Sequence, residues 1–165
     1  MSTKNDYGAE EWKAITGAPV AAGLYITLAD ASGPVGIAKE AMAVGKAITE
    51  SASADAPEVV KALAESVRNA GGRPELPDVP KTDRAQMKMA LIGTLQNAIS
   101  TVAAKSPAEA EAYKAWLVSV ATKVAHASKE GGFLGIGGTE VSTEEQEALN
   151  QLASALGTTG PAITT

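Results

Sequence analysis

The sequence predicts an all-α fold, a bundle of about six helices in a single domain spanning residues 1–165. Apolar residues recur with the helical period in nearly every segment, and none alternates apolar and polar residues as a half-buried strand does. Alanine, which costs no side-chain entropy in a helix, is abundant. Aromatic residues make up only 4% of the chain, so we expect Leu, Ile, Val and Met to pack against alanine faces.

The first half is expected to contain two long helices. The first covers residues 9–29 and is predicted to be interrupted near Gly17 and Pro19, because a proline inside a helix removes a hydrogen-bond donor and clashes with the preceding turn. The second runs over residues 35–50. Both carry apolar residues at helical spacing.

A third helix is predicted to start at Asp55 and Pro57, an acidic cap followed by proline. It ends at the glycine pair that opens residues 71–82, GGRPELPDVPKT. Three prolines spaced three residues apart favour an extended, polyproline-like path across the surface. Each half of the chain looks thin for an independent domain, so this segment is interpreted as a connector within one domain.

Two further helices follow the connector. Residues 83–104 carry apolar residues on more than one face, which predicts the most buried helix of the bundle. The next starts at Ser106 and Pro107, a serine cap followed by proline at the first helical position. Its apolar stripe has helical spacing: Tyr113, Trp116, Leu117, Val120, Ala121 and Val124.

The last helix starts at Ser142, and Glu145 three residues later completes a capping box. It stops at Gly157, and we expect residues 158–165 to form a flexible tail. The segments 26–42 and 124–149 each run from an apolar helix through a glycine-containing turn into a helix with early acids. This pattern suggests a duplicated helix–glycine turn–helix unit.

Charge and composition exclude several functions. The chain holds 19 acidic and 14 basic residues, and the net charge of −5 argues against a nucleic-acid partner, which needs a basic face. No cysteine is present, so thiolate metal sites and cysteine nucleophiles are excluded. No apolar run reaches the length of a membrane span, and the first residues do not resemble a secretory signal. We therefore expect a cytoplasmic protein.

The excess negative charge is confined to residues 130–165. They contain five glutamates and neither lysine nor arginine, which leaves 14 acids and 14 bases in residues 1–129. The same stretch holds an unusual loop, in which apolar residues alternate with glycines. Its members are Gly131, Gly132, Phe133, Leu134, Gly135, Ile136, Gly137 and Gly138.

This glycine loop has two interpretations. Phe133, Leu134 and Ile136 form an exposed apolar contact for a protein partner or a second copy, or they fold back and cap the open end of the bundle. A phosphate site is disfavoured, because the loop follows a helix, lacks a nearby lysine of the P-loop type and lies among glutamates.

A divalent-cation site suits the charge better, because oxygen ligands bind Ca²⁺ or Mg²⁺. The candidate ligands flank the two glycine-containing turns: Asp30 and Glu40 at the first, Glu130, Glu140 and Glu144 at the second. The competing interpretation is that Glu144 simply stands in the first turn of a helix, where the helix dipole favours an acid.

Catalysis finds little support in the sequence. The single histidine, His126, excludes any site that needs two. Glu130, four residues later, is either an orienting carboxylate or a surface pair. No Gly-x-Ser-x-Gly elbow and no Glu-x-x-His motif occurs. We therefore expect no catalytic residues.

The second half resembles TerB-like helical domains, a family named for bacterial tellurite resistance. The resemblance is carried by residues 116–127, Val141, Ser142, Thr143, Glu144, Glu145, Leu149, Leu152, Leu156 and Gly157. It implies a duplicated all-helical, stress-associated module that binds metal through acids in its turns. Where that family has aspartates in the turn, this chain has Ser128, Lys129 and the glycines of residues 131–138.

From these observations we expect a non-enzymatic helical module that acts through protein interaction or self-association. The alternative is a divalent-cation-binding domain that uses the turn acids.

Overall fold

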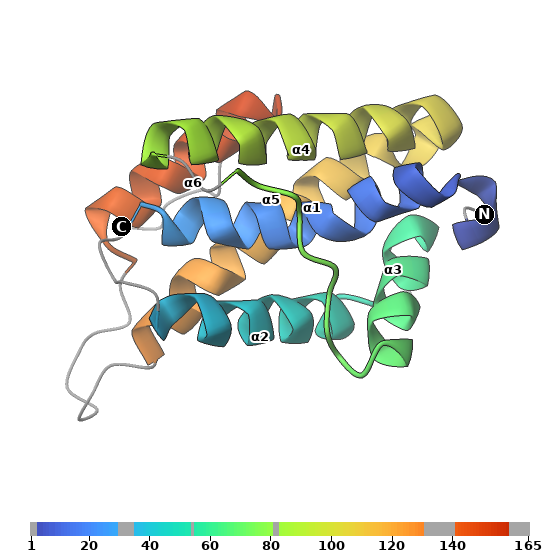
Figure 1. Cartoon of the computed structure of the whole chain (residues 1–165). Coiled ribbons are helices and arrows are strands. Elements are labelled where there is room, and N and C mark those ends of the chain that lie inside the picture. Colours follow the sequence, from blue (N-terminus) through green and yellow to red (C-terminus); the bar gives the residue numbers. More distant parts are fainter. Residues whose placement is uncertain (1–2, 30–34, 54, 81–82, 131–140, 159–165) are drawn as a thin grey trace.

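The all-α prediction is confirmed. The computed structural model describes residues 3–29, 35–53, 55–80, 83–130 and 141–158, and all regular structure in these ranges is helical (Figure 1). A short 3-10 turn, η1, precedes six α-helices that pack as a bundle. The elements are η1 (Lys4–Asp6), α1 (Ala9–Thr27), α2 (Val35–Glu50), α3 (Glu58–Asn69), α4 (Arg84–Lys105), α5 (Pro107–Glu130) and α6 (Thr143–Ala155).

Helix α1 is the centre of the bundle and contacts α2, α4, α5 and α6. Every residue from 15 to 23 is buried. The sequence of this stretch explains the burial, because alanine, glycine and valine let neighbouring helices approach from several sides. None of the described helices has the length and apolar character needed to cross a membrane.

The prediction that residues 83–104 form the most buried helix is wrong. Twelve residues of α1 are buried, against five of the longer α4. Met89 on α4 is 74% exposed, and Gly93 has open space around it. Helix α4 lies along one side of α1 (Figure 1), and its outer face, which carries Met89, is exposed.

The segment predicted as a connector joins α3 to α4. Described residues 73–80 form no regular structure, and the chain crosses α1 on its way from α3 to α4 (Figure 1). The Thr16 hydroxyl donates to the Glu75 carboxylate at 3.0 Å, and Pro77 lies against Gly17. A Cβ atom on Gly45 would stand 2.7 Å from the carbonyl oxygen of Gly72, so glycine is what lets the connector approach α2 this closely.

The start of α3 differs from the prediction. Its N-cap is Pro57, whose side chain accepts no hydrogen bond, and Asp55 is exposed. The carboxylate comes from another helix: Glu109 of α5 accepts from the backbone N–H of Val59 at 2.8 Å. A cap supplied by a residue fifty positions away leaves no local sequence pattern.

The predicted interruption of the first helix at Pro19 is also wrong, because α1 runs continuously from Ala9 to Thr27. Proline has no N–H to donate to the carbonyl four residues earlier, which belongs to Ile15. The hydroxyl of Tyr113, from α5, donates to this Ile15 carbonyl at 3.0 Å. Tyr113 is fully buried, and this burial raises the pKa of its hydroxyl. The tyrosine therefore replaces the donor that Pro19 lacks.

Replacing Tyr113 with phenylalanine removes this donor and leaves a buried carbonyl unpaired. We expect Tyr113→Phe to lower the free energy of unfolding by about 1–3 kcal/mol, measured by urea denaturation. In a Pro19→Ala background, the new alanine has an N–H of its own to donate to the Ile15 carbonyl, and Tyr113→Phe should cost clearly less. An equal cost in both backgrounds would show that the tyrosine does not compensate for the proline.

Gly23 lies where α1 packs closely against both α2 and α5. A Cβ atom there would stand 2.6 Å from Cγ2 of Val44 and 3.4 Å from Cγ2 of Val124. Valine is branched at Cβ and has one strongly preferred rotamer in a helix, so it cannot swing away at low cost. The three helices therefore depend on a residue without a side chain at this position.

Gly23→Ala and Gly93→Ala form a matched pair, since both glycines lie inside helices and gain about the same helix propensity. We expect Gly23→Ala to destabilise the protein by about 1–2 kcal/mol, because overpacking outweighs the propensity gain. Gly93→Ala should stabilise it by about 0.5–1 kcal/mol. Thermal and urea unfolding measure both, and a stabilised Gly23→Ala variant would contradict the close approach.

Candidate functional site

Most of the candidate site residues lie outside the described residues. This applies to the glycine loop, residues 131–138, and to Asp30 and Glu140. Glu40 and Glu130 lie within α2 and at the end of α5, where the backbone is described. Glu144 is described, in the first turn of α6, and its side chain is exposed.

The structure brings the helix termini that flank the two candidate turns to one end of the bundle. Helices α1 and α5 end, and α2 and α6 begin, at the end of the bundle that is on the left in Figure 1. We call this the loop end and define it by these four helix termini, Thr27, Val35, Glu130 and Thr143. Sequence spacing alone does not predict this meeting, because it depends on how α1 packs against α5 and α6.

Side chains from three helices tie α6 to the rest of the bundle near this end. The hydroxyl of Tyr25, in the last turns of α1, donates to Gln151 of α6 at 3.3 Å. The ammonium group of Lys88, on α4, lies 5.1 Å from the centre of the Tyr25 ring, within reach of a cation–π interaction. Helices α1, α4 and α6 are thereby held together beside the loop end.

The predicted capping box at the start of α6 is confirmed. The backbone N–H of Ser142 donates to Glu145 Oε2 at 2.9 Å, and the Ser142 hydroxyl donates to the same oxygen at 2.8 Å. In return, the N–H of Glu145 donates to the Ser142 hydroxyl at 3.2 Å. Glu145 is only 1% exposed, so its carboxylate is committed to the fold. Among the glutamates of α6, Glu144 and Glu147 face solvent.

Adjacent glutamates of α6 should therefore respond differently to truncation. We expect Glu145→Ala to lower the unfolding free energy by about 1.5–3 kcal/mol, because it removes bonds to a buried carboxylate. Glu144→Ala should cost less than about 1 kcal/mol, the value of an exposed acid at a helix N-terminus. Chemical denaturation of both variants checks this, and equal losses would contradict the assignment of Glu145 as the structural residue.

Within the described part of the chain, no three His, Asp or Glu side chains gather as metal ligands do. Most of the proposed cation ligands lie outside the described residues. The observation therefore does not test them and applies only to the other acidic residues. It leaves the loop end as the place where a cation site would have to be assembled.

His126 is exposed on α5, although a general base works best where its surroundings position it. The sequence predicted Glu130 of the same helix as its partner, but the side chain of Glu130 is not among those that the structure describes. The exposure of His126 therefore adds nothing in favour of catalysis.

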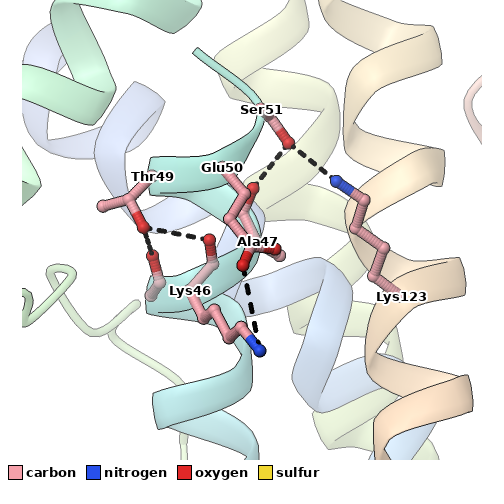
Figure 2. Close-up of polar contacts among 7 residues, drawn as sticks. Lys46, Ala47, Thr49, Glu50, Ser51 and Lys123 are labelled. Carbon is pink, nitrogen blue, oxygen red and sulfur yellow. Dashed lines mark hydrogen bonds and ion pairs between the residues drawn. The ribbon is translucent and has the colours of Figure 1, made fainter. Parts of the chain in front are cut away.

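A polar corner that the sequence did not reveal lies at the C-terminus of α2 (Figure 2). The ammonium group of Lys123, on α5, donates to the Ser51 hydroxyl at 3.2 Å, and that hydroxyl donates to the Ala47 carbonyl at 2.5 Å. A serine–lysine pair of this kind is used for nucleophilic catalysis when lysine accepts the serine proton. Here the serine proton is directed to Ala47 instead, so the geometry is not that of a nucleophile and its base.

The corner is better explained by the needs of a helix end. Helix α2 has no basic residue in its last turn, yet its C-terminal carbonyls attract positive charge. Two other helices bring positive charge to this end. Lys123 of α5 donates to the Ser51 hydroxyl, and Arg68 of α3 donates to the Thr49 carbonyl at 3.2 Å. Lys46 and Glu50 form an exposed ion pair at 3.8 Å along the same two turns, which contributes little to stability.

Four aromatic residues form two pairs in the core. Tyr7 and Trp12 have ring centres 5.8 Å apart, and Tyr113 and Trp116 have ring centres 5.7 Å apart. The indole N–H groups of Trp12 and Trp116 are buried, and neither has a hydrogen-bond acceptor among the described residues. A buried unpaired donor costs stability, and nothing around these two groups identifies a ligand that would relieve that cost.

Comparison of the chain with protein-family models, with curated proteins and with solved structures found no match. The resemblance to TerB-like domains therefore stays a prediction from sequence. Function has to be argued from the site itself, because an all-helical bundle is compatible with many activities.

Proposed function

We propose that the protein is a non-enzymatic helical module that acts through protein interaction or self-association, and that the loop end is its contact surface. The observation that carries the proposal is the meeting of four helix termini at one end of the bundle. Segments that connect helices are where binding residues concentrate, because a rigid scaffold positions them. The rigid part here is α1 with the helices packed around it.

The charge distribution supports the same surface. The glutamates that account for the net charge all belong to residues 130–165, and Glu144 and Glu147 are exposed on α6. Glu145 is excluded from the contact, since it is buried in the capping box. A partner would therefore meet the apolar residues of the glycine loop together with the acidic outer side of the start of α6.

The interaction proposal predicts that Phe133, the only phenylalanine of the chain, contacts a partner or a second copy. Phe133→Ser should weaken self-association or partner binding and leave the melting temperature unchanged, because an exposed contact contributes to binding and not to the core. Sedimentation velocity over a concentration series measures self-association. Pull-downs with the full-length protein and with the Phe133→Ser variant as baits, run in parallel, compare partner binding.

Met89→Ser is the matched control. It also replaces a large apolar side chain with serine, but Met89 is exposed on the face of a helix and lies outside the glycine loop. It should change neither the mass of the assembly nor the melting temperature. If Phe133→Ser instead lowers the unfolding free energy by about 3–5 kcal/mol, Phe133 is a core residue that caps the bundle, and the contact proposal is wrong. Unchanged association and unchanged stability would also reject it.

A second candidate function, divalent-cation binding, is favoured by the same convergence of helix termini. Asp30 and Glu40 belong to the α1–α2 connection and the helix after it, and Glu130, Glu140 and Glu144 flank the α5–α6 connection. Acids from two connections at one end can supply the six to eight oxygen ligands of Ca²⁺, or the fewer carboxylates of Mg²⁺ with water. The sequence resemblance to TerB-like domains points to the same chemistry.

Cation binding is tested by thermal unfolding of EDTA-treated protein with Ca²⁺, Mg²⁺, Mn²⁺ or Zn²⁺ added. A metal at about 100 times its dissociation constant should raise the unfolding free energy by about 2.7 kcal/mol. The double variant Glu140→Gln with Glu144→Gln should lose this gain, whereas Glu50→Gln, at the opposite end of α2, should keep it. The absence of a shift with all four metals would remove this candidate and leave the interaction proposal untouched.

A further inference from the structure

We draw no further inference here: the strongest candidate, the exposed and uncharged outer face of α4 around Met89 and Gly93, carries nothing because no feature of the described residues shows what covers it.

Discussion

The hydrogen bond from the Tyr113 hydroxyl to the Ile15 carbonyl is the contact on which the arrangement of this bundle depends. Helix α1, the central helix, continues without a break through Pro19, in the middle of its buried stretch. Proline leaves the Ile15 carbonyl without its usual donor, and Ile15 is fully buried. The Tyr113 hydroxyl, from α5, satisfies the carbonyl. The bond joins α1 to α5, and each of these two helices contacts at least four of the helices in the bundle. Gly23, one turn further along α1, then sets how closely α2 and α5 approach.

Several helix termini in the described part of the chain are contacted by side chains from other helices. Glu109 of α5 caps α3, Arg68 of α3 and Lys123 of α5 serve the end of α2, and Gln96 of α4 donates to Ala155 in the last turn of α6. The contacts of Glu109, Arg68 and Gln96 satisfy backbone groups that a helix end leaves without partners. Lys123 instead donates to the hydroxyl of Ser51, which in turn donates to the Ala47 carbonyl. Several polar side chains that resemble a reactive cluster, above all Ser51 with Lys123, are thereby assigned to the fold. At the loop end, by contrast, α6 has its own local cap and leaves Glu144 and Glu147 in solvent.

Features with a local physical cause could be predicted from the sequence. The helical period and the Ser142–Glu145 capping box each act over a few residues, and the structure confirms the helices and the capping box that they predict. The three errors share one cause. Continuity through Pro19, the cap of α3 and the exposure of α4 depend on residues far away in the chain: Tyr113, Glu109 and the small side chains of α1. Of the candidate site, the sequence could name the turn acids and the glycine loop, but not that the helix termini on both sides of the two connections lie at one end of the bundle.

The amino-acid order alone dictates that the chain forms helices, where most of them start and stop, and that its net negative charge lies in residues 130–165. These properties follow from the periodicity of apolar residues and from helix caps, which act over a few residues. The net charge is the sum of the charged residues in the sequence. Three outcomes instead required the packed bundle: which helix became the centre, which end holds the helix termini that flank the two glycine-containing connections, and which glutamate of α6 is buried. They depend on how closely helices can approach and on which distant donor or acceptor meets an unpaired backbone group. Both are properties of packing that no stretch of sequence contains alone.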